Sequence, residues 1–453
     1  MRVTRALRKL RGSIHPQYFK GLTSDCAIVN MPAPEKLYLS MAQHLGAPAK
    51  PIVAKGDVVV RGQCIAEAAG FISVPVHAPV SGKVLDVDSA PTPSGSMAPR
   101  IILETDPDNT DTNTMPPISD WRERPREELL KRICEAGVAG MGGAGFPTHV
   151  KLSPPSDKPI DTLIINGAEC EPYLTADHRL MVEQSEGIAN GIRIICHILN
   201  VKNVSVAIED NKPEAIKAMQ DALEPLEGID ATVCILPTEY PQGAEKQQIA
   251  VTTGREVPSG GLPMDVGCVV ENVGTVLAVA NAIENGNPLT HRVTTVTGHI
   301  VQTPQNVFAP IGTSYADLVS FCGGLTATAA KVISGGPMMG MAQPSLDVAT
   351  TKTTSGVVLL EESRVHVYRA LPCIGCGRCL EACPMNLVPA AISYAVEGGD
   401  YDRAESMNIL DCIECGCCAF VCPASRPLVQ HFKLAKPKII LKRRQAAAAK
   451  GAK

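Results

Sequence analysis

The chain has 453 residues, of which 45% are hydrophobic and 19% charged, and its formal net charge is −4. This length favours about three domains, and the composition is that of a globular protein rather than a disordered one. The balanced charge and the single tryptophan, Trp121, argue against a nucleic-acid partner. No run approaches the ~20 apolar residues of a membrane-spanning helix, and the basic N-terminus lacks the apolar core of a secretory signal. We therefore expect a protein of the cytosol or of the cytosolic face of a membrane.

The first 115 residues are dominated by a β pattern. Residues 51–90 contain short Val- and Ile-rich runs separated by the turn sequences KGD, RGQ and SGK, which predicts an all-β unit with tight turns. The pattern resembles the barrel-sandwich fold of biotinyl and lipoyl carrier domains, which present a modified lysine at a hairpin tip. The corresponding stretch, GFISVPVHAP, has no lysine. We therefore expect residues 1–115 to form a structural or docking domain and not a carrier.

The next 175 residues alternate helix and strand patterns. REELLKRICEAG and KPEAIKAMQDALEP have helical periodicity, whereas DTLIINGAE, VSVAIED and ATVCILP are short apolar strands. This alternation predicts a parallel sheet with helices on its faces, a Rossmann-like α/β domain over residues 116–290. Residues 291–362 change to short strands with one helix, which indicates a small β-grasp (SLBB-like) domain. The predicted fold class is thus a multidomain α/β plus β protein, completed by a helical C-terminal region.

Cysteines crowd near the C-terminus. Of the 17 cysteines, nine lie in residues 373–422, and in a reducing compartment such crowding indicates metal binding. CIGCGRCLEACP and CIECGCCAFVCP both fit C-x2-C-x2-C-x3-C-P, the pattern of two-cluster ferredoxins, in which the fourth cysteine binds the other cluster. Zinc is the alternative, but its sites typically have two well-separated C-x2-C pairs. One [4Fe–4S] cluster is therefore expected at Cys373, Cys376, Cys379 and Cys422, and the other at Cys412, Cys415, Cys418 and Cys383.

Spacing leaves Cys417 as the cysteine that binds no cluster. The segment between the motifs has an amphipathic helical pattern, so residues 363–430 are expected to form a helical, two-cluster ferredoxin-like domain. From Ala424 onward the chain has nine Lys or Arg residues and no Asp or Glu. Residues 431–453 are therefore expected to form a basic tail, which either contacts anionic lipid or an acidic subunit, or is a disordered solubilising end.

A glycine-rich loop follows the first predicted helix of the α/β domain. GVAGMGGAGFPTHVKL, residues 137–152, has five glycines in its first nine residues. Such a loop lets backbone N–H groups approach a phosphate closely, and Lys151 could add positive charge. The dinucleotide fingerprint G-x-G-x-x-G is absent. From the glycines alone, a phosphate-binding loop and a plain flexible loop remain equally open.

Four segments, in order, resemble the flavin- and NADH-binding subunit of respiratory complex I and related subunits of NAD-linked hydrogenases and formate dehydrogenases. GMGGAGFPTHVK resembles that family's GRGGAGFPTGLK, the loop that holds FMN, and NGAECEP is similar to its NADEGEP. TEYPQGAEKQQI is similar to YICGEET, and VENVGTV to NNVETL. The resemblance implies non-covalent FMN, NADH as the substrate, and no catalytic acid or base.

The resemblance also implies a set of binding residues. The flavin phosphate and ribityl chain would be held by Gly140, Gly142, Gly143, Ala144, Gly145 and Lys151. Asn166 would contact the isoalloxazine, and the NADH pocket would be lined by Phe146, Glu169, Glu171 and Glu245. The floor would be completed by Tyr240, Gly243, Asn272 and Thr275. Without the resemblance, Glu169 and Glu171 belong either to a solvated loop or to a ligand site, and we favour the ligand site because they directly follow a buried strand of the α/β domain. The chain departs from the family at Met141, Ala244 and Glu271, which replace Arg, Glu and Asn.

The order of the domains resembles the C subunit of Rnf-type ion-translocating oxidoreductases, as do IHPQY and MGGAGFPTHVKL. This resemblance implies an electron-input subunit that passes electrons between NADH, FMN and two [4Fe–4S] clusters. It implies the iron–sulfur B subunit and the membrane subunits D, G, A and E as partners, ferredoxin as an indirect one, and a peripheral location on the cytoplasmic face of the bacterial inner membrane. The alternatives are a cobalamin reductase of propanediol microcompartments, which has the same modules in another order, and a pure iron–sulfur electron-transfer scaffold.

Overall fold

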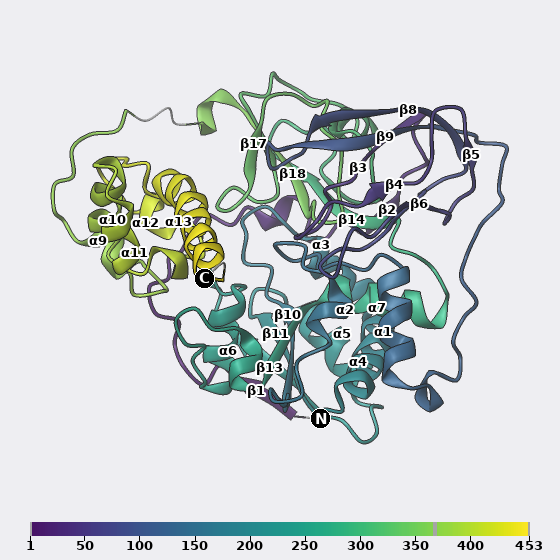
Figure 1. Ribbon diagram of the computed structural model, residues 1–453, viewed down its shortest axis with the longest axis horizontal. Coiled ribbons are helices and arrows are strands. Elements are labelled where there is room, and N and C mark those ends of the chain that lie inside the picture. Colours follow the sequence, from purple (N-terminus) through teal and green to yellow (C-terminus); the bar gives the residue numbers. More distant parts are fainter. Residues whose placement is uncertain (1, 366–368, 452–453) are drawn as a thin grey trace.

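The computed structural model describes residues 2–365 and 369–451, in which the strands form sheets of five, six, four and three strands. Figure 1 shows the helical C-terminal domain on one side of the molecule, with the α/β domain below and the β-rich domains above. Within the described residues, no helix is long and apolar enough to cross a membrane.

The α/β domain is built on a parallel sheet of strand order β1-β12-β11-β10-β13. Its strands are β1 (Arg2–Arg5), β10 (Thr162–Gly167), β11 (Asn203–Glu209), β12 (Asp230–Leu236) and β13 (Cys268–Asn272). One face is covered by α1 (Arg126–Glu135), α4 (Ser185–Leu199), α5 (Pro213–Leu223) and α7 (Val273–Glu284), and the other by α6 (Glu245–Thr253). Leu163 and Ile165 face the first group, and Ile164 faces α6, as the two-residue period of a strand requires. The predicted alternation of helices and strands is confirmed.

The first strand of this sheet comes from the N-terminus, which the sequence analysis placed in another domain. Arg2–Arg5 pair in parallel with Thr232–Ile235 of β12. Further along, β2 (Ile28–Asn30) pairs in parallel with β15 (Gln305–Pro310) of the β-grasp-like sheet. The expected first domain, residues 1–115, is therefore not one structural domain, because β1 and β2 belong to the sheets of two other domains. We call the segment that joins β1 to β2, residues 6–27, the N-terminal strap.

The barrel-sandwich region consists of two antiparallel sheets, as its turn pattern predicts. One sheet contains β3 (Lys36–Ser40), β9 (Met97–Thr105), β8 (Gly82–Pro91) and β5 (Val58–Val59), and the other β4 (Lys50–Pro51), β6 (Cys64–Glu67) and β7 (Val76–His77). Leu37, Leu103 and Ile65 are buried between them. This region is therefore a packed β domain whose apolar core is continuous with that of the α/β domain.

The β-grasp-like domain is a six-stranded mixed sheet with one helix against it. Its remaining elements are β14 (His291–Thr297), β16 (Lys331–Ser334), β17 (Met341–Gln343), β18 (Gly356–Leu360) and α8 (Tyr315–Phe321). Tyr315 and Leu318 of α8 pack on Val296 and Val307 of the sheet. Short strands with one helix were predicted, and the structure confirms them.

The C-terminal domain is helical, and the predicted basic tail belongs to it. Its helices are α9 (Arg378–Glu381), α10 (Pro389–Glu397), α11 (Tyr401–Ser406), α12 (Cys417–Phe420) and α13 (Leu428–Gly451). Phe432 and Ile439 of α13 are 1% exposed in the domain core. Lys442 pairs with Asp402, and Lys436 lies 2.7 Å from Glu414. The expectation of a disordered end is therefore wrong through residue 451, and residues 452–453 of that tail lie outside the described residues.

Candidate functional site

The glycine-rich loop presents unpaired backbone amides to solvent. Gly140 N donates to Phe146 O at 2.9 Å, and Met141 N donates to Thr275 Oγ1 at 3.0 Å, so both ends of the loop are held. Between them, residues 142–144 are exposed, and their N–H groups donate to no acceptor in the part of the chain that the structure describes. Three adjacent free N–H groups are a donor set that fits a phosphate.

The loop lies on the N-terminus of α7. The side-chain oxygen of Asn272 accepts from Gly274 N at 2.9 Å and from Thr275 N at 3.4 Å, which caps the helix. A Cβ on Gly142 would lie 2.8 Å from the Cβ of Asn272, so only glycine allows this approach. Because the N-terminus of a helix carries partial positive charge, it adds to the loop amides. The predicted residues Asn272 and Thr275 are thus brought next to the predicted loop, and the arrangement fits the phosphate of FMN.

A cluster of one lysine and two glutamates lies beside the loop. Lys151 Nζ is 2.7 Å from Glu245 Oε1, and Glu271 at the end of β13 is only 3% exposed. Burial raises the pKa of Glu271 to about 7, although Lys151 opposes this rise. Burial works to lower the pKa of Lys151, but Glu271 and Glu245 outweigh it and raise that pKa above its ordinary value. Lys151 is therefore held as a cation next to the loop.

Glu271 is a residue that the sequence analysis did not assign to the site. Its Oε1 is buried and has no hydrogen-bond partner among the described atoms. Buried polar atoms are almost always satisfied, so this oxygen is available to a bound group. The departure from the family's Asn at this position was the only signal in the sequence.

Asn166 and Gly243 are tied to each other below the loop. Asn166 Nδ2 donates to Gly243 O at 2.9 Å, and Asn166 Oδ1 accepts from Gln248 Nε2 at 2.8 Å. Gly243 N in turn donates to Cys170 Sγ at 3.2 Å. The side-chain amide of Asn166 therefore fixes the start of the β10 loop against the segment that leads into α6.

The two predicted acids of that loop also bind backbone amides. Glu169 accepts from Asp177 N at 2.8 Å and from His178 N at 3.0 Å, at the start of α3 (Ala176–Glu183). Glu171 accepts from Met338 N at 3.0 Å and from Met339 N at 2.7 Å in the β-grasp-like domain. Burial raises the pKa of Glu171 to about 7. The two carboxylates thus shape the loop, and the alternative of a solvated loop is wrong.

Tyr240 places the site next to the cysteine domain. Its side chain is fully buried, and its hydroxyl donates to Cys415 O at 2.7 Å. On the same segment of the α/β domain, Gln247 Nε2 donates to Pro384 O at 3.0 Å. Tyr240, one of the predicted floor residues, is therefore also part of the surface against which the cysteine motifs pack.

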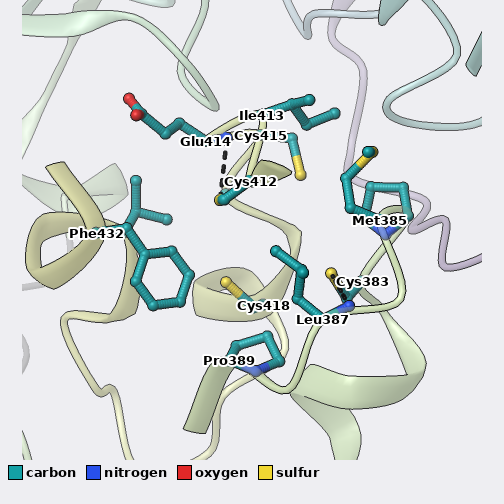
Figure 2. Close-up of a pocket in the computed structure, with 13 residues that line it drawn as sticks. Cys383, Met385, Leu387, Pro389, Cys412, Ile413, Glu414, Cys415, Cys418 and Phe432 are labelled. Carbon is teal, nitrogen blue, oxygen red and sulfur yellow. Dashed lines mark hydrogen bonds between the residues drawn. The ribbon is translucent and has the colours of Figure 1, made fainter. Parts of the chain in front are cut away.

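Cysteines of both motifs line one pocket. Figure 2 shows Cys383, the fourth cysteine of the first motif, facing the pocket formed by Cys412, Cys415 and Cys418 of the second. Amide groups point at two of these sulfurs, since Leu387 N lies 3.3 Å from Cys383 Sγ and Glu414 N 3.3 Å from Cys412 Sγ. Among the described residues, no three His, Cys, Asp or Glu side chains converge closely enough for a single ion. The thiols instead surround a small, largely apolar pocket, the kind of site that suits a cluster.

The other four predicted ligands lie together nearer the surface. Burial raises the pKa of the Cys379 thiol, an amide of Ala390 opposes this rise, and the charges of Cys373, Cys422 and Cys376 add to it. These four thiols are therefore close enough to interact. Cys376 is exposed, whereas Cys383, Cys415 and Cys418 are buried.

Cys417 is buried and does not line the pocket, although it packs beside Cys415, one of the pocket's cysteines. Its Sγ lies 3.9 Å from Tyr240 O, and it packs with Ile14 and Cys170 between the α/β domain and the second motif. The structure thus places this thiol in an apolar contact between domains.

A larger cavity lies on another side of the loop. It has a volume of about 500 Å³ and is lined by Arg61 of the barrel-sandwich region, Leu277 of α7 and Arg292 of β14. Met141 and Gly274, which adjoin predicted site residues, also line it. None of the predicted binding residues lines this cavity.

Comparison with protein families matches each part of the chain. Residues 8–108 match the RnfC barrel sandwich hybrid domain, and residues 133–281 match the Nuo51 FMN-binding domain. Residues 293–342 match the SLBB domain, and residues 366–423 match the 4Fe-4S dicluster domain. The predicted fold class is confirmed.

Relatives match over nearly the whole chain. It is 49% identical over 431 residues to the C subunit of the proton-translocating ferredoxin:NAD(+) oxidoreductase complex of Clostridium ljungdahlii, with 95% of this chain and 94% of that protein covered. It is 44% identical over 437 residues to the Na(+)-translocating counterpart of Acetobacterium woodii, with 96% and 98% covered. A chain in the crystal structure of an NAD+-reducing [NiFe]-hydrogenase in the H2-reduced state shares the fold at 18% identity, with a TM-score of 0.50 over 70% of this chain and 64% of that one.

Proposed function

The chain belongs to the family of C subunits of Rnf-type ion-translocating ferredoxin:NAD(+) oxidoreductases, and from this premise we propose that it is the subunit that exchanges electrons with NADH. The observation that carries the proposal is that the α/β domain contains both the loop of free amides and a residue in contact with the cysteine pocket. A loop of free amides on the N-terminus of α7 lies in the same domain as Tyr240, whose hydroxyl contacts the cysteine pocket. We propose that the nucleotide site and the iron–sulfur site adjoin at Tyr240, and the hydrogen bond from Tyr240 to Cys415 supports that arrangement.

We propose that the amides of residues 142–144 and Lys151 hold the FMN phosphate end, and that Glu271 and Glu245 face the bound flavin beside Lys151. FMN, when bound, supplies the exchange between two-electron hydride transfer and single-electron transfer. The chain's own part is to bind, orient and shield that group. The unpaired amides and the unpartnered oxygen of Glu271 support this assignment.

We propose that Cys383, Cys412, Cys415 and Cys418 hold an inner [4Fe–4S] cluster, and that Cys373, Cys376, Cys379 and Cys422 hold an outer one. The burial of Cys383, Cys415 and Cys418 and the contact of Cys415 with Tyr240 support the inner position. The outer position is supported by the exposure of Cys376 and of Ile374 beside it, which is 71% exposed. Electrons would then enter near the glycine loop and leave at the face around Ile374.

The proposed exit of electrons near Ile374 indicates where the partner subunits bind. We propose that the face around Ile374 meets the iron–sulfur B subunit, and that the chain is held on the cytoplasmic face of the membrane by that subunit and the membrane subunits D, G, A and E. Ferredoxin would then be reached through these subunits. In support, the named relatives are subunits of ion-translocating complexes, and the described helices include no membrane span.

Cofactor content after anaerobic purification tests the proposal. We expect about one FMN and about eight irons per chain. The Cys383→Ser variant should lose iron from the inner set while Cys376→Ser, the matched control, loses it from the outer set, and both should keep FMN. Zinc in place of iron, or a chain purified without flavin that does not bind added FMN, would contradict it.

A further inference from the structure

The N-terminal strap crosses the junction between the nucleotide site and the inner cysteine pocket. It leaves β1 at the α/β sheet, buries Leu10 in the apolar layer under α6, and ends at β2 in the β-grasp-like sheet. Both ends are therefore anchored by strand pairing in different domains. Between these two anchors, the strap crosses the region through which electrons would pass from the nucleotide site to the cysteine pocket.

Gly12 is the point at which the strap touches the cysteine pocket. Its φ is +63°, and a Cβ on it would lie 2.4 Å from the carbonyl carbon and oxygen of Cys383 and 2.7 Å from Pro384 N. Non-bonded carbons do not approach this closely, and the atoms involved are backbone, which cannot rotate away. The strap therefore lies directly on the backbone of a predicted ligand, and only glycine permits both the left-handed conformation and the contact.

Two residues later, the strap reaches a second cysteine of the same pocket through Tyr240. Ile14 and Tyr240 form an antiparallel bridge, with Ile14 N donating to Tyr240 O at 2.9 Å and Tyr240 N donating to Ile14 O at 3.0 Å. The hydroxyl of Tyr240 then donates to Cys415 O at 2.7 Å. The strap thus touches the first cysteine motif at Cys383 and reaches the second motif at Cys415 through Tyr240.

Further along, Lys20 holds the loop that follows β10. Its Nζ donates to Glu169 O at 2.7 Å, to Glu171 O at 3.0 Å and to Leu174 O at 2.6 Å. Glu169 and Tyr173 in that loop have φ of +47° and +69°, which non-glycine residues adopt only under constraint. One ammonium therefore gathers three carbonyls of a strained loop that carries two predicted site residues.

We propose that the strap is a positioning element that fixes the inner cysteine pocket against the nucleotide site, and that Gly12 is its critical residue. This inference rests on the proposed function. Gly12 takes no part in the chemistry. It acts through Cys383 and Tyr240, by setting the separation across which electrons pass.

The test compares Gly12→Ala with Gly228→Ala in the full-length, cofactor-loaded chain. Gly228 also has a positive φ, +75°, but a Cβ there meets no atom within 4 Å, so the control shares the backbone strain without the contact. Freeze-quench spectroscopy after mixing with NADH follows flavin bleaching and cluster reduction separately. In Gly12→Ala we expect flavin bleaching at the wild-type rate and cluster reduction slower by about tenfold or more, since small displacements between reacting groups have large effects on rate. Hydrogen exchange of residues 383–387, measured without NADH, should rise in Gly12→Ala only.

Each outcome decides the inference. If both glycine variants behave alike, or if Gly12→Ala slows flavin bleaching itself, the strap does not set this separation. If Gly12→Ala does not accumulate, Ile14→Ala replaces it, because this variant trims a side chain that is 6% exposed and packs against Tyr240. Ile14→Ala must then bleach the flavin at the wild-type rate and reduce the clusters more slowly than wild type. Cluster reduction at the wild-type rate in Ile14→Ala would overturn the inference. Failure of NADH to bleach the wild-type flavin would contradict the proposed function instead, so the two failures are distinguishable.

Discussion

The hydroxyl of Tyr240 donates a 2.7 Å hydrogen bond to the backbone carbonyl of Cys415. Tyr240 belongs to the α/β domain and Cys415 to the second cysteine motif, and the tyrosine side chain is completely buried. This bond is the shortest described connection between the predicted floor of the nucleotide site and a predicted cluster ligand. It makes the geometry of the cysteine pocket depend on the nucleotide domain.

Replacing this tyrosine tests the connection. Tyr240→Phe keeps the ring but leaves the buried carbonyl of Cys415 without its donor, which should cost about 1–2 kcal/mol. We expect the cost to appear as easier local opening of residues 412–418, measured by native-state hydrogen exchange. Tyr315→Phe, which removes a bond to Ser334 in the β-grasp-like domain, is the control and should leave these amides unchanged. Equal protection in Tyr240→Phe and wild type would show that the bond does not stabilise the pocket.

Lys151 should determine flavin affinity. Lys151→Met removes the cation beside the loop and leaves Glu245 and Glu271 to repel a phosphate, so the dissociation constant of FMN should rise about 10- to 100-fold. Quenching of FMN fluorescence in a titration of the flavin-free chain measures this. Lys158→Met, which removes a surface pair with Asp265, should leave the affinity unchanged. An unaltered affinity in Lys151→Met would place the phosphate elsewhere.

Glu271 should make stability depend on pH. Its pKa rises from 4.5 to about 7 because it is buried, so the folded chain holds this proton more tightly than the unfolded chain does. Stability is therefore lost as the pH rises between these two values, and the loss persists above them. Glu271→Gln cannot ionise, so it should be more stable than wild type by at most about 3 kcal/mol near pH 8, with no such gain near pH 5. Thermal unfolding of the flavin-free chain at both values checks this, and a gain of the same size at both would exclude ionisation of Glu271 as the cause.

The spare cysteine can be identified by counting iron. Cys417→Ser should keep both clusters, because this thiol packs against Tyr240 instead of lining the pocket. Its neighbour Cys418, which does line the pocket, is the matched comparison, and Cys418→Ser should lose about four of about eight irons. Iron analysis and visible absorbance measure the difference. Loss of four irons in Cys417→Ser would reverse the assignment of these adjacent residues.

The sequence predicts the local elements and the cysteine groups well, because both depend on short-range patterns. The alternating helix and strand patterns of residues 116–290 predict the parallel sheet. The ferredoxin spacing predicts that Cys383 joins the pocket of the second motif, where the structure places it. The glycine loop lies where the pattern suggested, on the N-terminus of α7. These features need only the period of a strand or helix and the spacing of ligands.

Features that depend on contacts between distant segments could not be predicted from the sequence. Nothing in the composition of residues 6–27 shows that Gly12 must fit against Cys383, or that Lys20 must bind three carbonyls some 150 residues away. The basic C-terminal segment was equally misleading, since Lys436 and Lys442 find acidic partners within their own domain. Charge and periodicity describe a segment by itself, whereas these roles arise only once the domains are packed together.

Anaerobic titration of the purified full-length chain with NADH tests the central claim most directly. If the chain is the electron-input subunit, NADH should bleach the flavin absorbance first and then the broad absorbance of the clusters. A chain whose flavin and clusters are reduced by dithionite but left unchanged by NADH would contradict the account.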